Sequence, residues 1–193
     1  MRLVFGSGNQ HKVAEVAEIL GQSLPELEIV GFTGEEPVED GVNFLENAMI
    51  KARNAFKLTS TPSFADDSGL CIEVMGGAPG IFSARWSGQK SDAVNRDLIL
   101  AQMQDVKSEH RAASFVATIA LVDETGEYSF TGVWSGNVAK EATGNSGFGY
   151  DPIFIPEGFQ VSAAELQLEV KNSMSHRAMA LTQLSSFLKT RPQ

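Results

Sequence analysis

The sequence has 193 residues, of which 42% are hydrophobic, and its formal net charge at pH 7 is -9. This composition is typical of a globular protein with a sizeable core, and it excludes disordered and fibrous chains. The acidic balance argues against a nucleic-acid polymer as partner, because such binding usually needs a basic surface. We therefore expect a single folded domain over residues 1–193.

The sequence predicts neither a secretory signal nor a membrane span. Its N-terminus reads as a strand rather than as a basic segment followed by an apolar one, and no apolar run is long enough to cross a bilayer. The only cysteine, Cys71, excludes an internal disulfide framework and fits a reducing compartment. We expect a cytoplasmic protein that does not bind membranes.

The chain begins with a predicted strand over residues 2–5 and a turn over 6–9. The spacing of apolar residues then predicts a helix whose inner face has four members: Val13, Val16, Ala17 and Leu20. Ser7 and Gln10 are three residues apart, as in a capping box at a helix start. The pattern therefore predicts a strand that leads through a tight turn into a capped helix.

A second strand is predicted over residues 28–32, and a second helix is predicted to begin near Asn43. Glu46, three residues beyond Asn43, would complete its N-terminal cap. The expected inner face of this helix has five members: Leu45, Ala48, Met49, Ala52 and Phe56. Two strand–helix pairs in succession are typical of an α/β protein.

The middle of the chain predicts a short strand at 63–65, a turn at 66–69 and a further strand at 70–74. The sequence Asp-Glu-Thr-Gly at 123–126 separates two long β-rich runs and is a hairpin signal. The remaining predicted elements are a helix at 92–103, strands at 112–122 and 128–138, a Gly-rich loop at 144–149 and an amphipathic helix at 175–188. Together these elements predict a mixed β-sheet flanked by helices.

The segment 7–12, Ser-Gly-Asn-Gln-His-Lys, is the first candidate for chemistry. A helix N-terminus offers free N–H groups and partial positive charge to phosphate oxygens, and Lys12 adds a full charge in the first turn. The spacing of Gly8 and Lys12 in this segment does not match the P-loop motif. An ordinary capped helix explains the same residues, so this motif alone leaves both interpretations open.

Four carboxylates form the second candidate: Glu39, Asp40, Asp66 and Asp67. Adjacent acids at a strand end are costly unless they are solvated, paired or bound to a metal, and a few oxygen ligands suit Mg²⁺. Lys51 would supply a second cation for a metal–phosphate site. The alternatives are an exposed Asx-rich turn at 66–69 and a solvated surface lysine.

The Gly-rich loop is the third candidate, because two glycines leave the Phe148 ring accessible as a platform on which a base can stack. Asp151 would accept a hydrogen bond from a ring N–H of the base. The alternative is a turn in which Phe148 fills the core. Near the last helix, His176 and Arg177 oppose the helix dipole, which an anion or a base bound nearby would compensate.

Taken together, the motifs resemble the inosine triphosphate pyrophosphatase family, the dITP/XTP house-cleaning enzymes. The matching segments are Ser-Gly-Asn-x-x-Lys from Ser7, Glu-Asp-Gly-x-Asn-Phe-x-Glu-Asn-Ala from Glu39, Ala-Asp-Asp-Ser-Gly-Leu from Ala65, the run from Gly76 to Gly88, Phe-Gly-Tyr-Asp-Pro from Phe148, and Ser-His-Arg from Ser175. They occur in this order over nearly the whole chain, and the joint pattern is specific.

The resemblance implies an elongated α/β fold with two lobes and a central cleft, a homodimer, and Mg²⁺-dependent cleavage of ITP, dITP and XTP between the α and β phosphates. It implies that Asp67 is the general base and a metal contact, with Glu39 as the second metal contact. The residues implied to hold the triphosphate and sugar are Ser7, Gly8, Asn9, Gln10, His11, Lys12, Lys51 and Ser68. Those implied to surround the base are Phe148, Gly149, Tyr150, Asp151, Lys171, His176 and Arg177.

Other function classes stay open on sequence alone. A phosphatase would release different products. The related septum-inhibition pyrophosphatases usually carry consecutive basic residues after the first-strand Ser, where this chain has Asn9-Gln10-His11. A non-catalytic nucleotide sensor would not need Asp67, and in an interaction domain the scattered cations would simply be solvated. Product analysis separates these possibilities.

Overall fold

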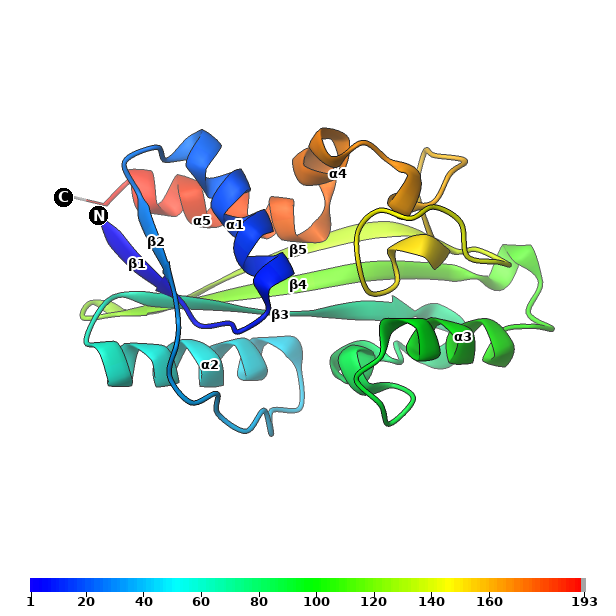
Figure 1. Ribbon diagram of the computed structural model, residues 1–193, viewed down its shortest axis with the longest axis horizontal. Coiled ribbons are helices and arrows are strands. Elements are labelled where there is room, and N and C mark those ends of the chain that lie inside the picture. Colours follow the sequence, from blue (N-terminus) through cyan, green and yellow to red (C-terminus); the bar gives the residue numbers. More distant parts are fainter. Residues whose placement is uncertain (192–193) are drawn as a thin grey trace. The chain divides into compact units, whose positions relative to one another are not determined.

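Figure 1 shows the protein as a computed structural model, which describes residues 1–191 and, among these, every side chain except those of Gln10 and His11. Six strands form one sheet in the order β2–β1–β3–β4–β5–β6. The strands are β1 Arg2–Phe5, β2 Glu28–Gly31, β3 Ser63–Ile72, β4 Ala112–Asp123, β5 Gly126–Val138 and β6 Phe154–Pro156. The α-helices are α1 Gln10–Ser23, α2 Phe44–Thr59, α3 Asp92–Gln102, α4 Leu168–Met174 and α5 His176–Lys189.

The sheet is mixed, as the sequence predicts. Strand β1 pairs in parallel with β2 and with β3, whereas β5 pairs antiparallel with β6. Strands β4 and β5 are neighbours and are joined only by residues 124–125. This connection is too short to join parallel strands, so β4 and β5 form an antiparallel hairpin. Among residues 1–191, no helix is both long and apolar enough to cross a membrane.

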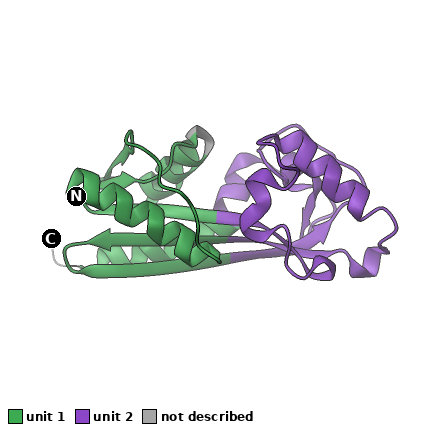
Figure 2. Cartoon of the chain, turned by 90° about the horizontal axis from the view of Figure 1, so that it is seen from below, with its two compact units in different colours: residues 1–67, 117–132, 176–193 green, residues 68–116, 133–175 purple. Residues whose placement is uncertain are grey.

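The chain divides into two compact units, coloured separately in Figure 2. Unit 1 contains residues 1–67, 117–132 and 176–193, and unit 2 contains residues 68–116 and 133–175. Strands β3, β4 and β5 contribute residues to both units. These units correspond to the two lobes that the resemblance implies.

In unit 1, both faces of the sheet are covered. Helices α1 and α5 lie on one face and α2 lies on the other (Figure 1). Successive residues of a strand point to opposite faces, so Phe64 packs toward α1 and α5, whereas Ala65 packs toward α2. The α2 face is lined by small residues, Ala48, Ala52 and Ala65, which let this helix approach the sheet closely.

Unit 2 has its own core, in which α3 packs against the second half of β3. Leu70 and Ile72 of β3 are fully buried together with Ile99 of α3. Phe154 of β6 completes this core, with its ring centroid 4.7 Å from that of Phe115 and 5.3 Å from that of Trp134. This core fixes the segment 144–153, whose Tyr150 and Ile153 are buried within it.

The prediction of a turn at 66–69 is wrong, because β3 runs without interruption from Ser63 to Ile72. Asp66 and Asp67 are therefore consecutive strand residues, and both are buried. The strand continues past them because their charges are paired with cations from the flanking helices. Gly69 is kept small by packing, since a Cβ there would collide with the Gly80 carbonyl and the Ser83 hydroxyl.

Two predicted inward-facing residues are exposed. On α1, Ala17 is exposed and Glu15 is buried instead. On α2, Leu45 is 42% exposed, because the buried face is rotated to include the polar Asn47 and Lys51. In both helices ion pairs or hydrogen bonds make burial of a polar side chain possible, which apolar periodicity does not reveal.

The predicted helix boundaries are otherwise close to those found. Asn43 caps α2, accepting a hydrogen bond from the backbone N–H of Glu46 at 2.9 Å, as expected. The predicted Ser7–Gln10 cap of α1 is replaced by Asn9, whose side chain accepts from the Lys12 N–H at 3.3 Å. The predicted final helix corresponds to α5, but the short helix α4 before it was not predicted.

Gly132→Ala should destabilise unit 1. A Cβ on Gly132 would lie 2.7 Å from the Cβ of Met179 and 2.9 Å from the backbone nitrogen of Ala180, and it would collide with the His176 carbonyl. Overpacking of this kind costs about 1–3 kcal/mol of unfolding free energy. Urea denaturation measures it, and Gly31→Ala, whose Cβ would meet nothing within 4 Å, is the matched control. Equal stability of the two variants would contradict this packing.

Candidate active site

The candidate site lies where β1 ends beside β3. Strand β1 pairs with β3 only through Val4 and Phe5, and the Gly6 N–H donates to the Phe64 carbonyl at 2.7 Å. Beyond this point the chain leaves β3 and turns into α1. On β3, Asp66 and Asp67 follow Phe64, the last residue paired with β1, by two and three positions. They therefore lie beyond the end of the β1–β3 pairing. Ligand sites in open α/β sheets commonly occur at the carboxyl ends of parallel strands such as β1.

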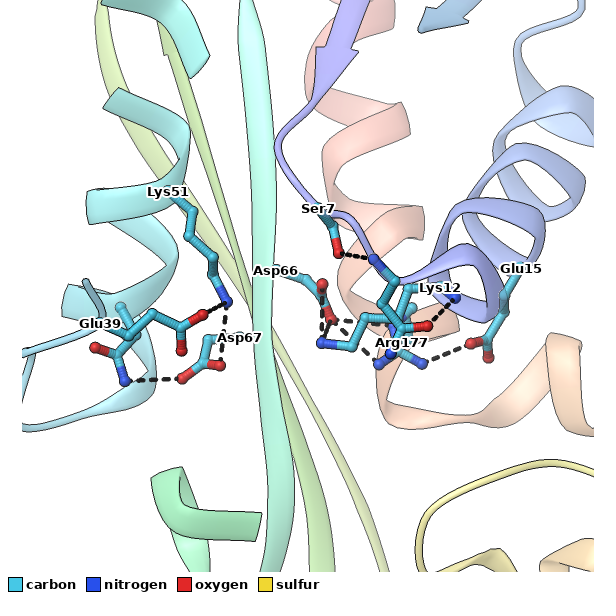
Figure 3. Close-up of polar contacts among 10 residues, drawn as sticks. Ser7, Lys12, Glu15, Glu39, Lys51, Asp66, Asp67 and Arg177 are labelled. Carbon is cyan, nitrogen blue, oxygen red and sulfur yellow. Dashed lines mark hydrogen bonds and ion pairs between the residues drawn. The ribbon is translucent and has the colours of Figure 1, made fainter. Parts of the chain in front are cut away.

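Asp67 faces α2, where two carboxylates meet one lysine (Figure 3). The Lys51 ammonium is 3.3 Å from Asp67 Oδ1 and 3.2 Å from Glu39 Oε1. The Asn47 side-chain amide donates to Asp67 Oδ2 at 3.2 Å, while its oxygen accepts from the Gly41 N–H at 2.9 Å. Asn47 thereby ties Asp67 to the loop that carries Glu39.

Asp66 faces α1 and α5, on the opposite side of β3 (Figure 3). Its Oδ2 is 3.0 Å from the Lys12 ammonium and accepts from the Arg177 guanidinium at 3.2 Å through both Nε and Nη2. Arg177 also donates from Nη1 to Glu15 Oε2 at 2.6 Å. Arg177 is 1% exposed, so this network of two cations and two carboxylates holds α1, α5 and β3 together inside unit 1.

The two neighbouring aspartates have opposite pKa shifts. Burial by itself would raise the pKa of Asp66, but the charges of Lys12 and Arg177 outweigh it and hold that pKa well below its usual range. Burial also raises the pKa of Asp67, and there the opposing charge of Lys51 is too weak to reverse the shift. Asp66 is thus a permanently charged structural group, and Asp67 is the stronger base of the two.

The loop before α1 presents backbone groups next to this network. Ser7 is half-buried, and its hydroxyl accepts from the Asn9 N–H at 3.2 Å. The Gly8 N–H donates to the carboxylate of Glu36 at 2.8 Å, so this loop binds an anionic oxygen already within the protein. The predicted roles of Gln10 and His11 rest on side chains that lie outside the described part of the chain.

The predicted base-binding loop belongs to unit 2. Asp151 Oδ2 accepts from the Phe148 N–H at 2.9 Å and from the Lys171 ammonium at 2.6 Å. The same ammonium lies 5.1 Å from the centroid of the half-buried Phe148 ring. Tyr150 is buried, and its hydroxyl donates to the Ser83 carbonyl at 2.7 Å.

The family can be assigned once these sites are compared with known proteins. The sequence profile of the Ham1 family matches residues 3–187, nearly the whole chain. The chain belongs to the Ham1 family. It is 51% identical to a dITP/XTP pyrophosphatase of Leifsonia xyli subsp. xyli, over 98% of this chain and 96% of that protein. It is 44% identical to a dITP/XTP pyrophosphatase of Pseudomonas aeruginosa, over 97% and 96% of the two chains.

The fold agrees with this assignment. The structure of a HAM1 protein from Coxiella burnetii superimposes with a TM-score of 0.90 at 41% identity. The alignment covers 99% of this chain and 100% of that one. The α/β fold implied by the sequence is therefore confirmed as the fold of Ham1 proteins.

Within this Ham1 chain, the structure brings together some of the predicted site residues. In unit 1, Glu39, Lys51 and Asp67 form one cluster, and Lys12, Asp66 and Arg177 form another (Figure 3). In unit 2, Phe148, Asp151 and Lys171 form a third. His176 is 5% exposed at the start of α5, and Ser68 is half-buried directly after Asp67. The expectation that Arg177 and the unit 2 loop contact one base stays a prediction.

Two residues of the site escaped sequence reasoning. Glu15 is a buried partner of Arg177, which is 162 positions away in the chain, and no local pattern reveals such a pair. Asn47 is 1% exposed and bridges Asp67 to Gly41. Its position one helical turn before Lys51 was the available signal, because residues four apart lie on the same helix face.

Asp66→Asn should destabilise the protein more than Asp67→Asn. Removing the Asp66 charge leaves Lys12 and Arg177 buried with Glu15 as the remaining carboxylate, and breaking a buried pair costs about 3–5 kcal/mol of unfolding free energy. In Asp67→Asn, Lys51 keeps its ion pair with Glu39, so a loss of about 1 kcal/mol is expected. Denaturant titration measures both, and the reverse order would refute a structural role for Asp66.

Proposed function

We propose that this chain hydrolyses deaminated purine nucleoside triphosphates (ITP, dITP and XTP) to the monophosphate and pyrophosphate. The observation that carries the proposal is the meeting of the Glu39 and Asp67 carboxylates at the Lys51 ammonium. The Lys51 carbonyl lies close to Gly6, where the loop before α1 begins. This arrangement offers a base, two oxygen ligands and a cation at one place. Relatives named dITP/XTP pyrophosphatase, up to 51% identical, support the choice of substrate class.

The donor set fits Mg²⁺. Glu39 and Asp67 each have an oxygen within 3.3 Å of the same Lys51 nitrogen, so their carboxylates converge on one point. Mg²⁺ is typically held by one or two carboxylates and keeps water and substrate phosphates as its other ligands. Among the described residues, no cluster of three or more His, Cys, Asp or Glu is found. When bound, Mg²⁺ neutralises phosphate charge and orients the triphosphate.

Asp67 is the proposed general base. Its carboxylate takes a proton from water as the water oxygen bonds to the α-phosphorus, and the bond from that phosphorus to the α–β bridging oxygen breaks. Pyrophosphate leaves with the electron pair of that bond. Asn47 and Lys51 each donate to one oxygen of Asp67, at 3.2 and 3.3 Å, and so fix the direction in which the carboxylate points.

The cations of unit 1 are the proposed partners of the phosphates. Lys51 is 9% exposed between two carboxylates, a setting that raises its pKa and keeps it charged although burial opposes this. Lys12 is oriented by Asp66, and the backbone N–H of Gly8 already binds a carboxylate oxygen, that of Glu36. Such fixed donors stabilise charge on the leaving pyrophosphate without reorganising during the reaction.

The proposed enzyme would distinguish deaminated bases from adenine by the group at position 6 of the purine ring. Deamination replaces the 6-amino donor of adenine with a keto acceptor, so a site that points donors at this position leaves them unpaired with ATP. Buried unpaired donors can lower the rate with the wrong substrate by on the order of 10⁴-fold. Arg177 directs Nε, Nη1 and Nη2 toward Asp66 and Glu15, which favours the unit 2 loop as the source of such donors.

Further parts of the proposal concern the whole protein. We infer that residues 1–193 act as one catalytic domain, since one family profile matches residues 3–187. A homodimer and a cytoplasmic location are proposed from the family resemblance. Light scattering of the purified protein measures the mass that tests the dimer.

Wild-type protein with Mg²⁺ should convert ITP to IMP and pyrophosphate, with ATP and GTP turned over far more slowly. Asp67→Asn should reduce kcat for ITP by about 10²–10⁴-fold, the usual contribution of a general base. Chromatography of nucleotides combined with a pyrophosphate assay measures both results. Asp97→Asn, which changes an exposed aspartate on α3, is the matched control and should retain activity.

The other outcomes favour other functions. Release of orthophosphate, or equal turnover of ATP and ITP, would indicate a general phosphohydrolase or a pyrophosphatase for other bases. Tight ITP binding without turnover would indicate a nucleotide sensor. Absence of both binding and turnover would favour an interaction domain.

Glu39→Gln should raise the Mg²⁺ concentration that gives half-maximal activity by about tenfold or more, because one of two anionic ligands is lost. The rate of pyrophosphate release from ITP is measured over a series of Mg²⁺ concentrations. The control is Asp40→Asn, which changes the exposed neighbouring carboxylate. An unchanged Mg²⁺ dependence in Glu39→Gln would remove Glu39 from the metal site.

A further inference from the structure

Helix α3 holds both backbone polar groups of one residue of the Gly-rich loop, Gly149. The Gly149 N–H donates to Asp92 Oδ2 at 2.7 Å, and the Gly149 carbonyl accepts from Arg96 Nη1 at 2.8 Å. Asp92 and Arg96 are four residues apart and therefore lie on the same face of α3. Both bonds have a charged partner, which makes them stronger than ordinary backbone hydrogen bonds.

Gly149 needs this support because its own conformation is permissive. Its φ of 60° is in the left-handed region, where glycine moves with little steric restriction. Gly147 on the other side of Phe148 has a φ of 76°, and a Cβ there would collide with the Asp151 carboxylate. Two glycines with free backbone rotation would leave Phe148 without a defined position unless other contacts fixed them.

Asp151 contacts both backbone polar groups of Phe148. The Asp151 N–H donates to the Phe148 carbonyl at 3.2 Å. The Phe148 N–H donates to the Asp151 carboxylate, which is held in turn by Lys171 at 2.6 Å. After Phe148 the next backbone groups are those of Gly149, and their partners Asp92 and Arg96 come from α3. Asp151 thus holds the backbone of Phe148, and Asp92 and Arg96 hold the backbone of Gly149 that follows it.

A role in helix stability alone does not explain this geometry. Asp92 is in the first turn of α3, where an acid stabilises the helix dipole whatever its side-chain orientation. Arg96 is half-buried, and its stem would pack equally well with the guanidinium turned to water. Both side chains nevertheless hydrogen-bond to the backbone of Gly149, one to its N–H and the other to its carbonyl.

We propose that Asp92 and Arg96 are positioning residues that fix the Phe148–Gly149 segment and thereby set the affinity and selectivity for the nucleobase. This inference rests on the proposed function, in which the Gly-rich loop receives the base. Both residues contact the loop that is proposed to receive the base, and neither belongs to the clusters proposed to hold the phosphates. Their loss should therefore weaken binding of the nucleotide more than it slows the chemical step.

Two pairs of variants separate hydrogen bonding from charge and bulk. Asp92→Ala removes the acceptor, whereas Asp92→Asn keeps an acceptor oxygen without the charge. Arg96→Met keeps the apolar stem without a donor, whereas Arg96→Lys keeps a donor. The control is Asp97→Ala, which removes an exposed carboxylate from the same helix. For each variant, kcat and KM are measured with ITP and with GTP, and Tm is measured by thermal unfolding.

Asp92→Ala and Arg96→Met should each raise KM for ITP by between about threefold and tenfold, the effect of losing one hydrogen bond. Their kcat should stay within about twofold of wild type, and their preference for ITP over GTP should fall. Asp92→Asn and Arg96→Lys should recover most of both properties. If Arg96→Met does not fold, the comparison of Asp92→Ala with Asp92→Asn decides.

Wild-type KM and preference in Asp92→Ala and Arg96→Met would overturn this inference alone. Equal losses in the conservative and disruptive variants would also overturn it, because they would indicate a general effect on the fold or on charge. Failure of the wild-type protein to hydrolyse ITP would overturn the proposed function and this inference with it.

Discussion

The alternation of side chains along β3 is the constraint on which the rest of the site depends. Two adjacent carboxylates cannot share one buried face at acceptable cost, because each needs its own compensating charge. A continuous strand directs Asp66 and Asp67 to opposite faces of the sheet. The helices that cover each face supply the compensating cations. Lys12 and Arg177 pair with Asp66 on one face, and Lys51 pairs with Asp67 on the other.

This division gives two chemically identical residues different surroundings and pKa shifts in opposite directions. Asp66 is surrounded by cations and joins three elements of unit 1, so its charge is used for stability. Asp67 has weaker compensation, and Glu39 beside it adds a second carboxylate at the same ammonium. Both aspartates are buried, and the number of neighbouring cations accounts for the opposite directions of their pKa shifts.

Unit 2 uses charged groups in the same way to order a flexible backbone. The glycines that leave Phe148 accessible also remove the steric restrictions that would fix it. Asp92, Arg96 and Asp151 replace these restrictions with charged hydrogen bonds to the backbone of the loop. A net charge of -9 is compatible with the proposed site for nucleotide phosphates, because local pairing rather than overall charge sets the field at each group.

The sequence by itself determined the order of most strands and helices, the mixed α/β class and, through its joined motifs, the family. It also singled out Glu39, Lys51 and Asp67, since these types of residue suit a metal–phosphate site wherever the fold brings them together. Only the tertiary structure decided that Asp66 and Asp67 lie on opposite faces, and that Glu15 is buried. Local patterns record periodicity and capping, whereas ion pairs between distant segments exist only after the chain has folded.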